Sequence, residues 1–148
     1  RFCTKDAFFC IQEINIGLAA DVGTLQRLPR LIPEGIVREL AFTGRRFKAE
    51  EALKFGLVNE VYETQEEMLN EVMEIAKEIC NKGPLAVSSS KEILNYSRDH
   101  SIDDSLNYVA LWNNAMGISE EMVETFKAKS EKREPDFEDL LPRKKYKE

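Results

Sequence analysis

Two carboxylates are the first candidates for chemistry in this sequence. Glu13 and Asp21 lie in the segment 12–29, where most neighbouring side chains are apolar or small. Such neighbours disfavour the ionised form of a carboxyl group, because they provide little to solvate its charge. A carboxyl group in that setting suits general acid and base catalysis near neutral pH. The pattern therefore makes Glu13 and Asp21 candidates for a pair that exchanges protons with a ligand.

Each of the two acids also has an ordinary structural interpretation. Asp is a favoured N-cap residue, and Asp21 stands directly before a helix predicted to begin near Val22. Glu13 follows an apolar run and can equally form an ion pair at the end of a strand. The residue types and their spacing leave these interpretations open beside the catalytic one.

Glycines on either side of Asp21 predict how the two acids are held. Gly17 and Gly23 allow sharp turns of the backbone, so we expect a loop that is followed by a helix. The other elements expected in this half are a strand at 7–11, a helix from Pro33 that ends at Gly44, a short helix at 49–56 and a strand at 57–62.

The remainder of the sequence predicts helices almost throughout. Thr64 and Glu67 have the spacing of a capping box, so a long amphipathic helix is expected to follow them. Three further helices are expected, with starts at Pro84, Ser101 and Ser119. The last segment, 131–148, is polar and charged, and we expect it to be a tail that is either unpacked or draped over a partner.

Composition and charge exclude several classes of protein. The chain has 148 residues, a length that fits one compact domain or part of a larger one. A formal net charge of −6 argues against general affinity for nucleic acid, and no apolar run is long enough to span a membrane. The cysteines are odd in number and lack metal-ligand spacing, which predicts neither a disulfide framework nor a zinc site: Cys3, Cys10 and Cys80.

The two ends of the chain carry no targeting pattern that we recognise. The sequence starts at Arg1 without Met or a signal-peptide pattern, so we expect residues upstream of it. It ends at Glu148 without a peroxisomal tripeptide. We therefore expect an intracellular protein of the cytoplasm or the mitochondrial matrix.

Several segments, in this order and spacing, resemble the enoyl-CoA hydratase/isomerase (crotonase) superfamily. They are 12–29, 39–46, 49–52 and 56–58. Within the superfamily, GLAADVGTLQR at 17–27 resembles the Δ3,5-Δ2,4-dienoyl-CoA isomerases, as do 96–101 and 105–110. Hydratases of the superfamily usually carry glycine where this chain has Asp21. The resemblance therefore favours the isomerase branch.

The resemblance implies an α/β, crotonase-like fold. Residues 1–63 would be the end of a ββα spiral core, 64–130 a helical trimerisation segment and 131–148 the tail. Trimers, or hexamers built from them, are expected. The oxyanion hole and a third acid of the family belong to segments upstream of Arg1, so we expect the chain alone to be inactive.

The resemblance also implies roles for particular residues. Asp21 would be the base near the thioester and Glu13 the group that delivers a proton to the distal carbon of a dienoyl-CoA, in fatty-acid β-oxidation and without a cofactor. Phe126 and Lys129 would contact the CoA nucleotide. Lys132 or Arg133 could equally be the matching basic residue, and a core Phe126 with a solvated Lys129 is the plain alternative.

Other functions and residues remain open at this point. One alternative is an enoyl-CoA hydratase, and another is a non-catalytic CoA-binding or assembly module. His100 is the only histidine, and we expect it to cap a helix or pack at the surface. Three aromatic residues at helical spacing are expected in a core or interface rather than at a cofactor: Tyr96, Tyr108 and Trp112.

Overall fold

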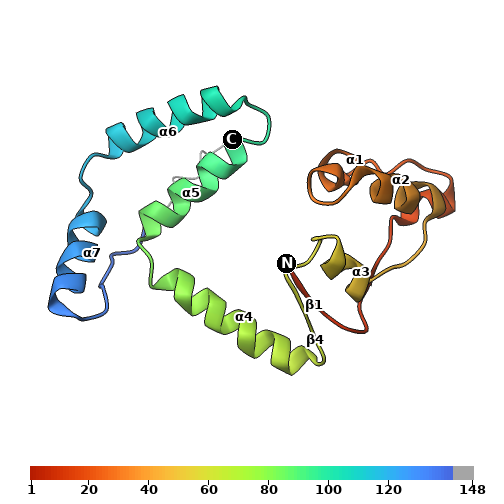
Figure 1. Cartoon of the computed structure of the whole chain (residues 1–148), viewed down its shortest axis with the longest axis horizontal. Helices are drawn as coiled ribbons and strands as arrows, with labels where there is room; N and C mark the ends of the chain where they lie inside the picture. The colour runs from red at the N-terminus through yellow and green to blue at the C-terminus, as the bar shows by residue number, and fades with distance from the viewer. Residues whose placement is uncertain (142–148) are drawn as a thin grey trace. The chain divides into compact units, whose positions relative to one another are not determined.

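The protein is described by a computed structural model that covers residues 1–141 (Figure 1). Its contacts divide it into two compact units, the first at Arg1–Glu74 and the second from Ile75 onward. The division falls inside helix α4 (Gln65–Cys80). The boundary between residues 63 and 64, where the trimerisation segment would begin, stays a prediction. Each unit is described separately below.

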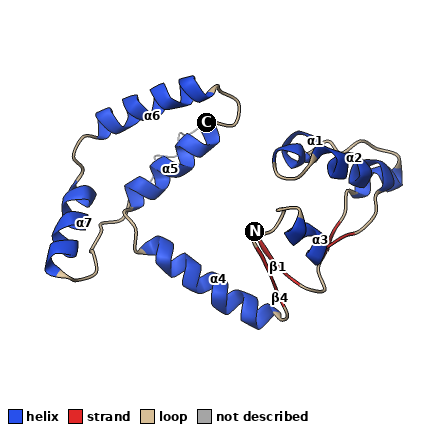
Figure 2. Cartoon of the chain, viewed as in Figure 1, coloured by secondary structure: helices blue, strands red, loops and turns tan. Residues whose placement is uncertain are grey.

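Four short strands in the first unit form two small sheets (Figure 2). Strand β1 (Phe2–Thr4) pairs in parallel with β4 (Glu60–Tyr62), and β2 (Phe8–Phe9) pairs antiparallel with β3 (Phe47–Lys48). The strands predicted at 7–11 and 57–62 are therefore shorter than expected. The amides of Leu57 and Val58 donate to the carbonyl of Ala52, at 2.8 and 3.2 Å, so they belong to a turn and not to a ladder.

The helices of the first unit are short, except for one. They are η1 (Gln12–Ile16), α1 (Thr24–Arg27), η2 (Leu28–Arg30), α2 (Glu34–Thr43) and α3 (Ala49–Lys54). Helix α2 begins after Pro33 and ends at Gly44, as predicted. The helix predicted near Val22 is interrupted, because Pro29 cannot donate a backbone hydrogen bond and a 3₁₀ turn replaces the regular helix there.

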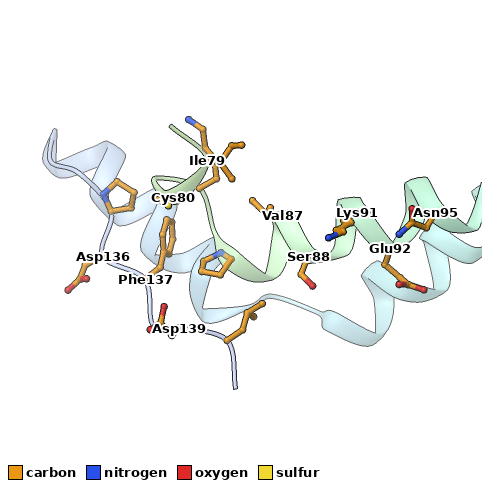
Figure 3. Close-up of a pocket in the computed structure, with 14 residues that line it drawn as sticks. Ile79, Cys80, Val87, Ser88, Lys91, Glu92, Asn95, Asp136, Phe137 and Asp139 are labelled. Carbon is orange, nitrogen blue, oxygen red and sulfur yellow. The ribbon is translucent and has the colours of Figure 1, made fainter. Parts of the chain in front are cut away.

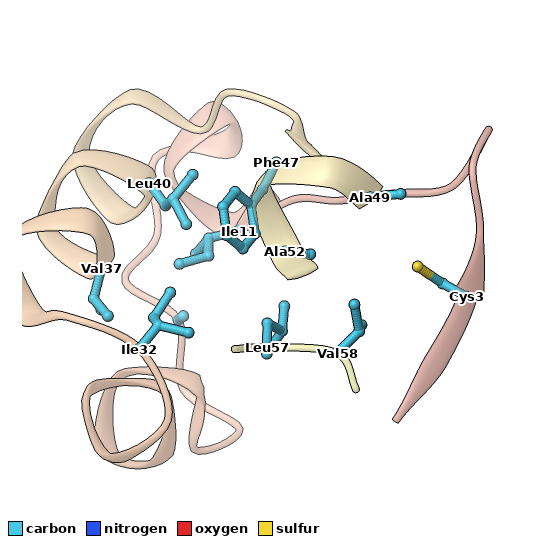
Figure 4. Close-up of a cluster of buried hydrophobic side chains, with 11 residues drawn as sticks. Cys3, Ile11, Ile32, Val37, Leu40, Phe47, Ala49, Ala52, Leu57 and Val58 are labelled. Carbon is cyan, nitrogen blue, oxygen red and sulfur yellow. The ribbon is translucent and has the colours of Figure 1, made fainter. Parts of the chain in front are cut away.

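A cluster of buried apolar side chains forms the core of this unit (Figure 4). Phe47 is one of its members, with 2% of its surface exposed, and its ring stacks on Phe55 with centroids 6.2 Å apart. Each such side chain contributes about 1.5–3 kcal/mol when it leaves water. The other members come from β1, α2, α3 and the loops and turns between elements: Cys3, Ile11, Ala20, Ile32, Val37, Leu40, Ala49, Ala52, Leu57 and Val58.

The second unit is helical in the part of the chain that the structure describes. After α4 it contains α5 (Pro84–Tyr96), α6 (Ile102–Met116) and α7 (Glu120–Glu131). The predicted N-caps are confirmed, since Ser101 Oγ accepts from the Asp104 amide at 3.1 Å and Ser119 Oγ from the Met122 amide at 3.2 Å. Thr64 caps α4 in the same way, accepting from the amide of Glu67. No described helix is long and apolar enough to cross a membrane.

The described part of the segment after α7 packs on that helix, so the unpacked alternative is wrong for it, and the partner-draped alternative stays a prediction. The carboxylate of Glu124 accepts from the guanidinium of Arg133 and from the amide of Asp136 at 2.9 Å. Phe137 is half-buried. Polar composition alone missed this packing, because one carboxylate on α7 supplies the hydrogen bonds that hold the segment. The last seven residues of the predicted tail, 142–148, lie outside the described residues.

Candidate functional site

Glu13 lies in the 3₁₀ turn η1 and is half-buried. Its carbonyl accepts from the amide of Leu18 at 3.0 Å, and Gly17 ends the turn with φ of +78°. The strand-end interpretation of Glu13 is therefore wrong, because β2 ends at Phe9 and the acid belongs to the following turn. This turn fixes the backbone of Glu13 on its C-terminal side.

Asp21 lies in the loop between η1 and α1, and its side chain is exposed. Ala20, directly before it, is buried in the core and anchors the loop. The capping interpretation is wrong, because the N-cap residue of α1 is Gly23, with φ of +96° and no side-chain cap. Asp21 is thus an accessible carboxylate beside a residue that is fixed in the core.

The apolar residues around the two acids do not enclose them in the described part of the chain. Ile16 is 67% exposed, Leu18 58% and Val22 76%. The expectation of a dry setting was wrong here because Ala20 is the one loop residue from 17 to 23 whose side chain is buried. The result is two carboxylates with exposed apolar side chains between them, a surface that is open to a ligand or to further protein.

An ion-pair network fixes the frame behind this loop. The guanidinium of Arg45 donates to Glu39 on α2 at 2.6 Å and to Glu51 on α3 at 3.0 Å. These hydrogen bonds raise the pKa of Arg45, and the bond from Arg45 lowers the pKa of the Glu51 carboxyl below its usual value. Glu51 also accepts from the Lys48 amide at the start of α3. Arg45 therefore connects two helices that both contribute to the core.

The predicted nucleotide contacts lie in the second unit. Phe126 and Lys129 are three residues apart on α7, so they share one face of the helix. Both are exposed, and Phe126 is 63% exposed, so the interpretation of Phe126 as a core residue is wrong for the described chain. Arg133, an alternative basic residue, binds Glu124 and Glu131, whose hydrogen bonds raise the pKa of Arg133.

Two cavities of the second unit differ in whether a predicted site residue lines them. One, of about 600 Å³, lies among α5, α6 and α7 and includes Phe126 in its wall. The other, of about 730 Å³, lies beside the end of α4, helix α5 and the segment 135–140 (Figure 3). Charges of both signs line the second cavity, including Lys91 and Asp136, and none of the predicted site residues does.

The aromatic residues and His100 pack on one another. The ring of Tyr96 stacks on His100 with centroids 3.6 Å apart and on Tyr108 at 4.0 Å. His100 Nδ1 lies 2.7 Å from the carbonyl of Tyr96 and 2.8 Å from Asp99, just after α5 ends. Burial is the main cause of the raised pKa of Tyr108. The packing interpretation of these residues agrees with this geometry.

The cysteines are free thiols, and the described residues hold no cluster of three or more potential ligands that could bind a metal ion. Sequence reasoning missed two groups near the predicted site residues. The first is the contact of Asn15 with Gly44, which no local pattern announces. The second is Glu121, which accepts from the amides of Leu85 and Ala86 at the start of α5, at 2.8 and 3.4 Å.

Comparisons with known proteins give a consistent result. A model of the enoyl-CoA hydratase/isomerase family matches residues 1–141. The chain is 50% identical to human mitochondrial Δ3,5-Δ2,4-dienoyl-CoA isomerase over 135 residues, which are 90% of this chain and 41% of that protein. Identity is 45% to the peroxisomal enzyme of the same name from Arabidopsis thaliana, over 95% of this chain and 50% of that protein. Identity to carnitinyl-CoA dehydratase from Salmonella arizonae is 36%, over 91% of this chain and 53% of that protein.

A solved structure gives the fold. The crystal structure of an enoyl-CoA hydratase from Mycobacterium marinum superimposes with a TM-score of 0.85 and 35% identity, over 93% of this chain and 56% of that one. The predicted α/β, crotonase-like fold is confirmed. The chain spans about half the length, or less, of the curated relatives that it matches.

Proposed function

The chain belongs to the enoyl-CoA hydratase/isomerase family, and from this premise we propose that it supplies the two carboxylates of a dienoyl-CoA isomerase in fatty-acid β-oxidation. One observation carries the proposal: identity is 50% and 45% to proteins named dienoyl-CoA isomerase and falls to 36% for a dehydratase of the same family. The presence of an acid at position 21 supports the same choice.

The proposed reaction needs two proton transfers at separate carbons. Asp21 takes a proton from the carbon next to the thioester, and the electrons of that C–H bond shift the double bonds along the chain. Glu13 delivers a proton to the distal carbon, so the product has the composition of the substrate. A single carboxylate would not reach both carbons of an extended substrate. Exchange with water then returns both acids to their starting states.

The environment of the two acids fits this division of work. Asp21 is exposed beside the buried Ala20, and Glu13 lies in a closed turn, so both carboxylates have a fixed backbone. The exposed side chains of Ile16, Leu18 and Val22 offer an apolar surface for an acyl chain. Donors that stabilise the enolate oxygen would come from outside this chain, and losing one such donor costs about 100-fold or more in rate.

Phe126 and Lys129 are proposed to contact the nucleotide of CoA. Their shared, exposed face of α7 leaves both side chains accessible. A lysine ammonium suits a phosphate group as a point charge. We propose no cofactor beyond the CoA thioester of the substrate.

Assembly into trimers or hexamers is proposed through the helical segment. It rests on the large apolar side chains that α6 leaves exposed, including Ile102 and Leu111. For the compartment we propose the mitochondrial matrix, since the names of the human and mouse relatives include the word mitochondrial. Sedimentation and cell fractionation, respectively, test these two points.

The test of the main proposal is a paired assay of the polypeptide expressed from its complete natural reading frame. A 3,5-dienoyl-CoA and a 2-enoyl-CoA are offered to the wild type and to Asp21→Asn, with Asp6→Asn as the control, since Asp6 is another exposed acid of the first unit. We expect isomerisation by the wild type and by D6N, and a loss of about 100-fold or more in D21N.

Other results would replace the proposal with one of its alternatives. Hydration of the 2-enoyl-CoA without isomerisation would identify a hydratase, the activity named for the M. marinum structure. Binding of CoA esters without turnover of either substrate would identify a CoA-binding module. Unchanged isomerisation in D21N would remove Asp21 from the mechanism.

A further inference from the structure

The C-terminal end of α2 lies directly against the turn that carries Glu13. The carbonyl oxygen of Gly44 accepts from Asn15 Nδ2 at 3.4 Å and from the thiol of Cys10 at 3.1 Å. Asn15 Nδ2 also donates to the side-chain oxygen of Gln12 at 3.1 Å. Side chains on both sides of Glu13 therefore converge on one carbonyl group at the end of a helix.

Gly44 also lies too close to η1 to allow a side chain. A Cβ atom built there would lie 2.6 and 2.7 Å from the amide atoms of Asn15 and 2.8 Å from Cγ2 of Ile14. The Asn15 amide could rotate away only by leaving the Gly44 carbonyl. Cγ2 of Ile14 is bonded to a branched Cβ, so it retreats only if χ1 changes or the turn itself moves. A side chain at position 44 would therefore displace η1.

Gly117 shows that this restriction is separate from backbone strain. Gly44 and Gly117 both end helices with φ of +59°, which favours glycine, but ψ is 21° at Gly44 and −147° at Gly117. A Cβ atom at Gly117 would meet nothing within 4 Å. Both glycines therefore have a backbone requirement, which is the stricter one at Gly117. Gly44 alone of the pair has a second requirement, which is its approach to the turn of Glu13.

We propose that Gly44 and Asn15 are positioning residues for Glu13: they fix the orientation of η1 on the end of α2 and so fix where the Glu13 carboxylate stands. The inference rests on the proposed function, in which Glu13 delivers a proton to the substrate. A catalytic group must be held within about 0.5 Å of its productive position. A displacement of about 1 Å costs on the order of 100-fold in rate.

The test compares Gly44→Ala with Gly117→Ala in the polypeptide expressed from its complete natural reading frame. Both variants lower the midpoint of thermal unfolding, because each places alanine at φ of +59°. We expect kcat for a 3,5-dienoyl-CoA to fall roughly 10- to 100-fold in G44A, with KM changed less than about 2-fold. In G117A we expect kcat to stay within about 2-fold of the wild type.

Asn15 provides a second variant that leaves the backbone requirement untouched. Asn15→Ala removes an exposed side chain, and we expect kcat to fall roughly 5-fold while thermal stability changes little. In the double variant N15A/G44A, removal of the Asn15 side chain opens part of the space at position 44. The loss of kcat should therefore be smaller than the product of the two single losses.

The outcomes separate the two proposals. A wild type that turns over no dienoyl-CoA would overturn the proposed function, and the positioning role with it. An active wild type in which G44A and G117A have the same kcat, or in which N15A keeps full kcat, would overturn the positioning role alone. If G44A does not fold, the kcat of N15A alone tests the positioning role: a loss supports it and an unchanged value overturns it.

Discussion

The two units of the chain are built in opposite ways. The first has strands of two or three residues and mostly short helices, yet it contains the cluster of buried apolar side chains. The second has long helices, but the buried residues of its described helices are Ser89 and Ala128. Large apolar side chains there lie in solvent, with Ile102 79%, Leu111 70% and Ile118 81% exposed.

This difference shows that regular secondary structure and a core need not coincide. Helices of the second unit arise from local signals, namely caps and periodic apolar residues. In the described chain α5 and α6 are joined by the stack of the half-buried Tyr96 and Tyr108 rings and by the bond from Trp112 Nε1 to Ser89 Oγ at 2.9 Å. The first unit depends on its cluster of buried apolar side chains instead, so its stability should respond to different substitutions.

The largest expected effect tests the core of the first unit. Phe47→Ala should cost about 3–5 kcal/mol of unfolding free energy, because it leaves a cavity among buried neighbours. Leu111→Ala, at an exposed position of α6, is the control and should stay within about 0.5 kcal/mol. Denaturant unfolding followed by circular dichroism measures both.

The same pair of variants also tests whether the two units differ in their cores. Equal costs at the two positions would show that the second unit has a core of its own. A cost at Leu111 that grows with protein concentration would show that another copy of the chain covers α6, as the proposed assembly requires.

A smaller effect is expected at the polar contact between α7 and α5. Glu121→Ala removes the acceptor for the amides of Leu85 and Ala86 and should cost about 1–2 kcal/mol. Glu120→Ala is the matched control, since Glu120 is the neighbouring acid in the first turn of α7 and is exposed. Amide hydrogen exchange at Leu85 gives the local readout, and equal protection in both variants would contradict the assigned contact.

The next effect in size concerns one helix by itself. Ser101→Ala removes the side-chain acceptor at the N-cap of α6 and should cost about 1 kcal/mol. Ser90→Ala, within α5, should be neutral or slightly stabilising, because alanine is the better helix former and the Ser90 hydroxyl bonds only its own helix. Helical circular dichroism during thermal unfolding distinguishes them, and a larger loss in S90A would contradict the local origin of these helices.

The smallest effect is a pH dependence at the end of the second unit. Hydrogen bonds from Arg133 and from the Asp136 amide lower the pKa of Glu124 from 4.5 to about 2. Below pH 4.5 the unfolded chain takes up a proton at Glu124 that the folded chain does not, so the folded state loses stability as pH falls towards about 2. Unfolding at about pH 5 and about pH 3 in the wild type and in Glu124→Gln checks this, because the variant should lose part of the acid dependence.

The sequence predicted the features that depend on local chemistry. The end of α2 at Gly44 and the caps at Ser101 and Ser119 are confirmed, since each is decided within a few residues. Strand lengths were not predicted, because Leu57 and Val58 look like strand residues but bond to the carbonyl of Ala52. Apolar side chains at these two positions are compatible with a strand or with a buried turn, and the tertiary structure determines which of the two forms.

In the candidate site, too, the features that depend on tertiary structure could not be predicted from the sequence. Glu13 and Asp21 became candidates because of their apolar and small neighbours, a family resemblance supplied their roles, and those roles stay predictions. Their surroundings were not predictable, because exposure of Ile16, Leu18 and Val22 depends on which loop residue enters the core. Contacts over long stretches of sequence, such as Asn15 with Gly44 or Leu85 with Glu121, leave no local pattern to detect.

The bond from Trp112 to Ser89 makes the second unit observable by itself. Trp112 is the single tryptophan of the chain, and it is half-buried where α6 meets α5, beside the ring of Tyr108. Its fluorescence emission should shift to longer wavelength when α5 and α6 separate, because the indole then enters water. The first unit contributes no tryptophan signal, so emission and far-ultraviolet circular dichroism followed in one titration would resolve whether the two units melt together or in sequence.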